Sequence, residues 1–437
     1  MSRTVRAGYQ RGAAARLPRM TATNASVDAT SSVLPDEIEG LRTKVETALP
    51  RYLDDLATLV NIDCGSYTKA GVDRVGAFVA DRLSALGAQV DVRAHERLGN
   101  SVVGTFEGSP GGRRVVLIGH MDTVFDEGTA AARPFRIEGG RAYGPGVTDM
   151  KSGLLAGLYA IEAARAVAEG GSMPFERITL IANPDEEIGS PTSTPIIEEL
   201  ARDADACLVL ECARANGDIV SSRKGIIDAR MTVHGRAAHA GVEPEKGRSA
   251  ILAAATLVPA LHGLTGRRVG VTCNVGVFHG GTRPNVVAEE ATFEVDVRAV
   301  TRADLEATEA EIADLIANPI LPDVTIEMET MARWWPMEKL ERSGRLVEHA
   351  QAVARQLGFE VRDAATGGAS DANTTSGMGV ASLDGLGPIG GMDHSPAEYL
   401  EVASIVPRTA LLAGLLLAIG RDPVVAEWRA AGPVTKG

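Results

Sequence analysis

Three short apolar runs, separated by segments with helical periodicity, constrain the fold most strongly. The runs are VVLIGH at 115–120, ITLIAN at 178–183 and CLVLE at 207–211. Continuous apolar strands of this length are typical of a sheet buried on both faces, and intervening helices supply the crossovers of a parallel sheet. From about residue 37 the sequence therefore predicts an α/β domain whose mainly parallel sheet is sandwiched by helices.

The order of expected strands and helices is different between residues 224 and 333. A β-α-β-β-α-β order is expected there, with strands at 226–235, 270–279, 288–299 and 323–330 and helices at 246–262 and 302–317. This order is the ferredoxin-like split motif, which can close on itself as a small domain. The α/β pattern then resumes, so the small domain is inserted into a larger one. The expected parts are a basic tail, two halves of the large domain around the insert, and a C-terminal tail, with bounds 1–36, 37–223, 224–333, 334–421 and 422–437.

Charge and cysteine content exclude several classes of protein. A formal net charge of -13 and a pI near 5.2 argue against nucleic acid or an anionic membrane as a partner, because both require clustered positive charge. No stretch reaches the roughly 18 uncharged apolar residues of a membrane span. The cysteines have no CxxC spacing, which favours free buried thiols in a reducing cytoplasm. They are Cys64, Cys207, Cys212 and Cys273.

The first 33 residues are rich in arginine, nearly free of acidic residues, and lack the continuous apolar segment of a secretory signal. Two origins stay open for this segment: an organellar transit peptide, or translation from an upstream start codon with Met20 as the true start. We expect a disordered tail without a catalytic role.

Polar residues follow each apolar run where the strand ends. His120 and Asp122 follow the first run, the acidic triplet 185–187 follows the second, and Glu211 ends the third. In open parallel α/β sheets ligands bind in the crevice outside the carboxyl ends of the strands. We expect these groups to converge there, together with Asp149 in YGPGVTDMKSG and His394 in GGMDHSPAEY.

Each of these residues also has an ordinary structural reading. A strand-end histidine is more often a satisfied polar residue, an aspartate before a helix is usually an N-cap, and an acidic triplet is usually a solvated turn. Together, however, they supply two imidazoles and at least four carboxylates. Concentrating that much negative charge costs several kcal/mol unless cations offset it. A divalent metal is the simplest offset.

The residue types suggest which metal. Histidine and carboxylate ligands without thiolate suit zinc, with manganese or cobalt as substitutes. The ligands exceed what one catalytic zinc needs, whereas two metals about 3.5–4 Å apart and bridged by a carboxylate would use them. Because residues i and i+2 of a strand share a face, Asp122 can hold one ring nitrogen of His120 while the other faces a metal or a substrate.

The five ordered motifs GHMDTV, GPGVTDMKSG, NPDEEIGS, LVLE and GGMDHSPAEY resemble those of the co-catalytic zinc metallopeptidases. This family includes acetylornithine deacetylase, succinyl-diaminopimelate desuccinylase and glutamate carboxypeptidase, and the resemblance is closest to the last. It covers about residues 37–421, including the insert.

The resemblance implies a role for each candidate site residue in the large domain. It implies that a water bridging two Zn²⁺ ions attacks an amide carbonyl, while Glu186 takes the proton as general base and passes it to the leaving amine. Asp122 would orient a ligand, and Asp149 would bridge the metals. One metal would be held by His120 and Glu211, the other by Glu187 and His394.

The resemblance also implies roles for residues in the insert, which would form a homodimer. His239 in TVHGRAAHAG would reach across the dimer to the substrate carbonyl, although a loop histidine is the ordinary reading. Asn285 in GGTRPNVVAEEA would contact substrate. Arg333 in MARWWPM could grip a substrate carboxylate bidentately, against the alternative of a solvated arginine. Two departures from the family pattern are Met150, where some members carry aspartate, and Val-Ala in NVVA, where others carry a proline.

The sequence thus predicts a cytoplasmic, dimeric zinc exopeptidase or amidase that releases a C-terminal amino acid, with glutamate expected, from a peptide or N-acyl conjugate. Glu211, where aminopeptidase-like relatives tend to carry aspartate, favours the carboxypeptidase and deacylase side. The main alternative is an N-acyl amino acid deacylase. A catalytically silent metal-binding or dimerisation module is a remote alternative, because such a module would be expected to have lost Glu186 or a ligand.

Overall fold

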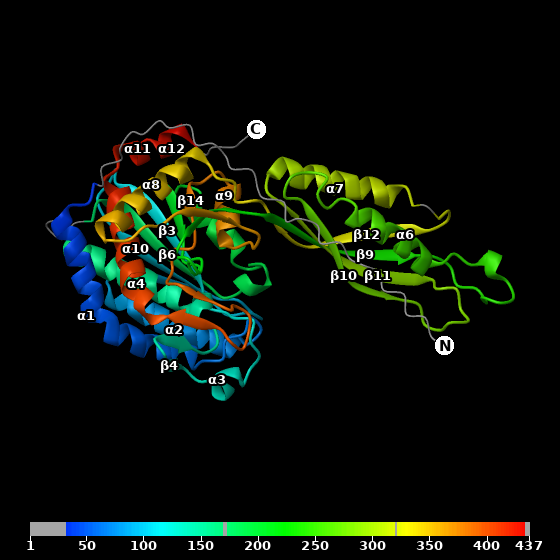
Figure 1. Ribbon diagram of the computed structural model, residues 1–437, viewed down its shortest axis with the longest axis horizontal. Helices are drawn as coiled ribbons and strands as arrows, with labels where there is room; N and C mark the ends of the chain where they lie inside the picture. The colour runs from blue at the N-terminus through cyan, green and yellow to red at the C-terminus, as the bar shows by residue number, and fades with distance from the viewer. Residues whose placement is uncertain (1–31, 169–172, 320, 433–437) are drawn as a thin grey trace, which may run out of the picture.

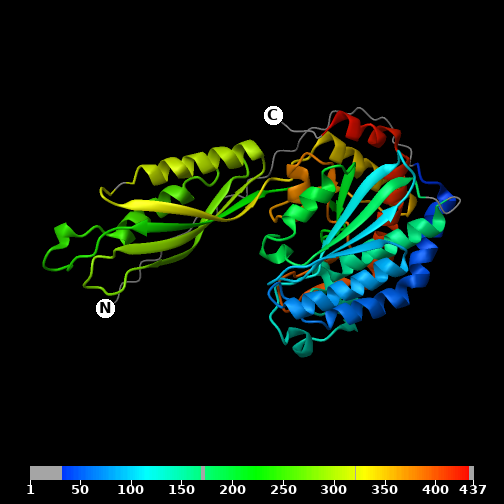
Figure 2. The ribbon, with the colours of Figure 1, turned by 180° about the vertical axis from the view of Figure 1, so that it is seen from behind.

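Two lobes make up the molecule, a large α/β domain and an elongated arm that projects from it (Figures 1 and 2). The structure is a computed structural model that describes residues 32–168, 173–319 and 321–432. Most of the predicted basic tail, up to residue 31, lies outside the described residues. All four cysteines lie inside them and are buried and free, as the sequence predicts.

A six-stranded mixed sheet forms the centre of the large domain. Its strands lie in the order β1-β2-β6-β3-β7-β14, with parallel pairing from β6 to β14 and antiparallel pairing of β2 with β1 and β6. The antiparallel edge was not predicted, because strand direction depends on connections that a local pattern does not encode. The bounds are β1 Gln89–Arg93, β2 Ser101–Glu107, β3 Arg113–His120, β6 Phe175–Asn183, β7 Ala206–Val209 and β14 Ser382–Leu383.

Helices cover both faces of this sheet, and β3 shows why. Val115 and Leu117 pack into one apolar core, while Val116 and Ile118 pack into another on the opposite face. A continuous apolar strand is therefore buried on both sides. The first core is covered by α1 Pro35–Val60, α2 Lys69–Ala85, α4 Ser152–Val167, α8 Glu341–Gln356 and α10 Ile405–Arg421, and the second by α5 Thr194–Ala201 and α9 Asp371–Gly377.

Among the residues that the structure describes, one segment is long and apolar enough by length and composition to cross a membrane, although Arg408 interrupts its apolar run. It is Val402–Arg421, which contains α10, and 78% of its most apolar window is buried inside the protein. Helix α10 packs against α4, α1 and α8. Its apolar character is therefore that of a central core helix.

The arm has the predicted β-α-β-β-α-β order. Its four antiparallel strands lie in the order β10-β11-β9-β12, and α6 and α7 cover one face (Figure 1). Alternating burial along β9 explains why this face is the covered one. Ala229, Met231 and Val233 are buried, while the residues between them are not. The bounds are β9 Gly225–His234, α6 Ala250–His262, β10 Thr272–Gly280, β11 Glu290–Ala299, α7 Arg302–Ala317 and β12 Thr325–Trp334.

Short elements complete the large domain. A small sheet of order β15-β16-β5-β4 joins residues far apart in sequence, and β8 pairs with β13. In the segment assigned to a C-terminal tail, two short helices add Val425 and Trp428 to the main core. The remaining bounds are α3 Thr129–Ala132, β4 Arg136–Glu138, β5 Arg141–Tyr143, β8 Ile219–Arg223, β13 Asp363–Thr366, β15 Gly390–Gly391, β16 Tyr399–Glu401, α11 Pro423–Ala426 and α12 Trp428–Ala431.

Candidate metal centre

The parallel register of the sheet brings three strand ends together. His120 of β3 lies opposite Asn183 of β6, and Ile118 lies opposite Val209 of β7. The residues that follow β6 and β7 are therefore delivered to the same edge as His120, as predicted. A turn after β6 carries Glu186 and Glu187, and Glu211 comes two residues after β7.

Asp122 is a fully buried carboxylate that organises this edge. Its Oδ1 lies 3.4 Å from His120 Nδ1, and the same ring nitrogen lies 3.0 Å from the Asp122 carbonyl oxygen. The carboxylate also accepts hydrogen bonds from the backbone N–H groups of Glu186 at 3.1 Å and Glu187 at 3.2 Å, and from Ser66 Oγ at 2.6 Å. Asp122 thus ties the His120 ring to the turn that carries both glutamates.

Asp149 faces two imidazoles, one on each carboxylate oxygen. Its Oδ1 lies 3.2 Å from His120 Nε2, and its Oδ2 lies 3.1 Å from His394 Nε2. His120 Nε2 is also 3.6 Å from Glu211 Oε1, and His394 Nε2 is 3.0 Å from Glu187 Oε2. The residues form two triplets, each with one imidazole and one glutamate, that share Asp149.

Glu186 lies beside the first triplet. One oxygen of Glu186 and one of Glu211 lie within 4.8 Å of each other and of a His120 nitrogen. Both glutamates are buried, and burial raises their pKa values well above the usual value for glutamate. A raised pKa makes a carboxyl group a stronger proton acceptor.

The neighbouring carboxylates also raise the pKa values of the two imidazoles. Hydrogen bonds to Asp149 and Glu187 raise the pKa of His394 to about 10. Burial opposes protonation of His120, but the contacts with Asp122 and Asp149 outweigh it and raise its pKa well above 6.5. Burial also raises the pKa of Asp149, yet the two imidazoles outweigh this effect and lower it. The carboxylates therefore attract positive charge strongly, as a cation site would.

The residue types fit zinc, and the spacing comes close to that of a zinc site. Two ligand atoms that are each about 2.0–2.2 Å from one tetrahedral zinc lie roughly 3.3–3.6 Å apart. The four imidazole–carboxylate separations within the triplets are 3.2, 3.6, 3.1 and 3.0 Å, so one lies inside this range and three are shorter. Within the part of the chain that the structure describes, groups of three or more candidate ligands occur only here. The sulfur of Met150 accepts the His120 backbone N–H at 3.2 Å.

Comparison with known proteins identifies the family. Residues 116–418 match the family described as Peptidase family M20/M25/M40. The chain belongs to this family. Over 380 residues it is 31% identical to carboxypeptidase G2 of Pseudomonas sp. (strain RS-16), covering 85% of this chain and 90% of that protein. It is 28% identical over 314 residues to the succinyl-diaminopimelate desuccinylase of Delftia acidovorans, covering 67% of this chain and 78% of the relative.

A solved structure has the same fold. The aminopeptidase PepT of Bacillus cereus superposes with a TM-score of 0.70 at 21% identity, covering 85% of this chain and 99% of that one. Membership of the M20 family makes the chain a metal-dependent hydrolase of peptide or amide bonds. The fold class predicted from the pattern of strands and helices is confirmed.

Two of the three residues predicted from the insert lie on loops remote from the candidate metal ligands. His239 and Asn285 are exposed on two adjacent loops, where the Ala240 N–H donates to the Asn285 carbonyl at 3.1 Å. These loops, 235–249 and 281–289, lie at the end of the arm farthest from the large domain in both views (Figures 1 and 2). Arg333, on β12, bonds to Glu309 of α7 and lies 5.2 Å from the ring centre of Trp335.

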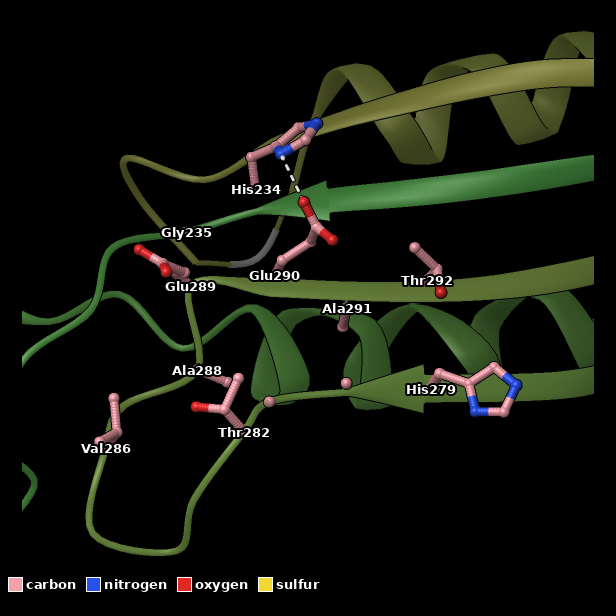
Figure 3. A pocket seen from close by; sticks show the side chains of 12 residues that line it. His234, Gly235, His279, Thr282, Val286, Ala288, Glu289, Glu290, Ala291 and Thr292 are labelled. Atoms are coloured by element: carbon pink, nitrogen blue, oxygen red, sulfur yellow. Dashed lines mark ion pairs between the residues drawn. The ribbon is translucent and has the colours of Figure 1, made fainter.

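A hollow of about 560 Å³ lies at the base of these two loops, on the arm and away from the ligands. In Figure 3, His234 and Glu290 point toward each other from β9 and β11, 4.0 Å apart, and His279 lies on β10. Val286, which also lines the hollow, pairs with His239 through a single bridge. The hollow therefore adjoins the loops with the predicted substrate contacts.

Two buried carboxylates at the site were missed by the sequence analysis. Asp371, at the start of α9, accepts hydrogen bonds from Ser190 Oγ at 2.6 Å and from the Asn183 side chain, and so braces both ends of the turn that carries Glu186. Glu398 contacts the Asp149 loop. Glu398 stands only four residues after His394 in GGMDHSPAEY, and this proximity was the one available signal.

Proposed function

We propose that the chain is a dinuclear zinc carboxypeptidase or amidase that releases a C-terminal amino acid, with glutamate the first candidate, from a peptide or N-acyl conjugate. The single observation that carries this proposal is Asp149, whose two oxygens each face a different imidazole at 3.2 and 3.1 Å. That arrangement suits a carboxylate bridging two metals. Similarity to carboxypeptidase G2 supports the carboxypeptidase assignment.

The chain's own residues divide the chemistry between them. His120, Glu211 and Asp149 would hold one zinc, and Asp149, Glu187 and His394 the other. When bound, the two ions lower the pKa of a water molecule and polarise the substrate carbonyl. Glu186 accepts the water proton and delivers it to the leaving amine, which its buried position and raised pKa favour. Asp122 keeps the His120 ring oriented throughout.

A second copy of the chain would complete the substrate site. The loops 235–249 and 281–289, which carry His239 and Asn285, lie at the far end of the arm, so within one chain these loops are remote from the candidate metal ligands. A partner's arm could bring its own His239 to the carbonyl oxygen, where an imidazole donor would stabilise the developing negative charge. Arg333, close to the junction of arm and large domain, would exchange Glu309 for the substrate carboxylate.

An exposed apolar face on the arm supports such pairing. Ile251 of α6 and Phe278 of β10 are 38% and 40% exposed, and β10 is an edge strand of its sheet. A side chain added at Gly280 would lie 2.9 Å from Ile251, so the helix and the strand end form one surface. Edge strands and apolar faces of this kind pair with another chain.

An N-acyl amino acid deacylase is the second candidate, favoured by the similarity to succinyl-diaminopimelate desuccinylases. Zinc-loaded protein should be assayed on N-acyl glutamates, folate-type conjugates, succinyl-diaminopimelate, acetylornithine and dipeptides. We expect the highest kcat/KM for substrates that release glutamate. A highest value for acetylornithine or succinyl-diaminopimelate would establish the deacylase instead, and no hydrolysis of any substrate would contradict both candidates.

A further inference from the structure

The loop that carries Asp149 is held partly by its own backbone, since the Val147 N–H donates to the Gly144 carbonyl at 3.2 Å and the Lys151 N–H to the Gly146 carbonyl at 3.1 Å. It joins β5 to α4, and Gly144 and Gly146 within it have φ values of 142° and 71°. The backbone at Asp149 itself is non-helical, and Gly146 and Thr148 are buried. Buried peptide N–H groups require an acceptor inside the protein. A loop of this kind positions a metal ligand only if something outside it satisfies these groups.

Glu398 supplies the acceptors. Its Oε2 accepts the N–H of Gly146 at 2.9 Å, and its Oε1 accepts those of Thr148 at 2.9 Å and Asp149 at 3.1 Å. The side chain is 2% exposed, so water does not compete for these hydrogen bonds. Resting on the proposed function, we propose that Glu398 is a positioning residue that fixes Asp149 between the two metal ions.

Strand pairing explains how a residue so distant in sequence reaches this loop. Tyr399 of β16 pairs with Tyr143 of β5, so Glu398, just before β16, lies opposite the start of the Asp149 loop. His394 belongs to the same segment, and its Nε2 lies 3.1 Å from Asp149 Oδ2. Residues 394–398 therefore hold Asp149 at both ends, with an imidazole on its side chain and a carboxylate on its peptide.

The contacts also explain why a carboxylate is needed here. All three partners are donors, and they use both oxygens of Glu398. A glutamine keeps the shape but turns an NH₂ group toward at least one of these N–H groups. Loss of this acceptor should therefore loosen Asp149, and with it both metal subsites, without removing any ligand.

The test compares Glu398→Gln with Glu401→Gln in the full-length protein, stripped with chelator and reloaded. Glu401 lies three residues later and bonds at the surface to Arg141 at 2.8 Å, so it is a matched control. We expect Glu398→Gln to weaken zinc binding roughly 10- to 100-fold, the range for groups that orient ligands, and to change the absorption bands of the cobalt-loaded protein. Glu401→Gln should leave both unchanged.

A Glu398→Gln protein that binds zinc as tightly as the wild type, or that loses only thermal stability in the metal-free state, would overturn the positioning role. If Glu398→Gln does not fold, Glu398→Asp, which keeps both acceptors on a shorter side chain, decides the question by the same two measurements. A wild-type protein that binds no zinc would overturn the metal centre and this inference together. Two zinc ions in both wild type and variant, with equal affinity, would overturn the inference alone.

Discussion

At the scale of single residues, a change at Glu186 allows proton transfer to be tested separately from metal binding. Its oxygens neighbour the first triplet, but the imidazole–carboxylate contacts at 3.0–3.6 Å involve other residues. Glu186→Gln should therefore keep the fold and both metals while turnover falls about 10²- to 10⁴-fold, the usual contribution of a positioned acid–base group. Metal analysis and steady-state kinetics on one preparation would check this. Near-normal turnover would remove Glu186 from the mechanism.

Arg333 tests how the substrate carboxylate is recognised. Arg333→Lys keeps the positive charge but loses the planar fork, so kcat/KM for an acyl-glutamate should fall on the order of 10- to 100-fold, as for loss of a hydrogen bond to a charged group. The α-carboxamide analogue should be affected far less. Arg302→Lys is the matched control, because Arg302 packs on the same Trp335 ring at 3.9 Å. An equal decrease in kcat/KM for both substrates would show that Arg333 has a structural role and does not bind the substrate carboxylate.

The sequence indicated the candidate metal ligands better than the residues that hold those ligands in place. His120, Asp149, Glu186, Glu187, Glu211 and His394 could be predicted because they follow strands or stand in short motifs, and the structure gathers all six at one edge. Asp371 and Glu398 could not, because their partners lie 181 residues or more away in the sequence. Each has the appearance of an ordinary acidic residue until the fold supplies the N–H or hydroxyl groups that it accepts.

At the scale of elements, the central strands, the major helices and the whole split motif of the arm were predictable from periodicity. The antiparallel edge formed by β1 and β2 was not. Strand β1 has no buried position and no regular alternation of burial, and nothing in it specifies its neighbour's direction. The Asp149 loop was expected only as a glycine-rich turn, since its backbone path depends on contacts with β16 and Glu398. Local patterns specify elements, whereas pairing between distant segments specifies the site.

The close approach of α4 to β7 gives an element-scale prediction. A Cβ at Gly153, in the first turn of α4, would lie 1.9 Å from the carbonyl oxygen of Leu210, the residue before Glu211. Gly153→Ala should therefore destabilise the protein by about 1–3 kcal/mol or more, as overpacking does, and weaken zinc binding by displacing the Asp149 loop from Glu211. Urea unfolding and metal titration would measure both effects.

The same substitution in α8 is the control. At Gly344 the nearest heavy atom to an added Cβ is 3.9 Å away, so Gly344→Ala should stabilise the protein by up to about 1 kcal/mol through helix propensity. If Gly153→Ala destabilises the protein and Gly344→Ala stabilises it, the close backbone contact explains why glycine is required at position 153. The general effect of replacing a glycine in a helix would not explain such a difference. A neutral Gly153→Ala would contradict it.

At the scale of the whole molecule, the arm separates His239 from the metal ligands, and activity should therefore depend on assembly. The surface formed by α6 and β10 is the proposed interface, with Ile251 and Phe278 exposed at its centre. Replacing both by glutamate would place like charges opposite each other across a two-fold interface. We expect a monomer by sedimentation velocity that keeps two zinc ions but loses most of its turnover, because no partner supplies His239.

Val424→Glu is the control, because Val424 is 41% exposed on α11 of the large domain, far from the arm's outer end. It should stay dimeric and active, which would separate the loss of the interface from the mere addition of surface charge. A double variant that remains dimeric would place the interface elsewhere on the chain. A monomer with full turnover would show that one chain suffices, since the His239 loop would then act within its own chain or not at all.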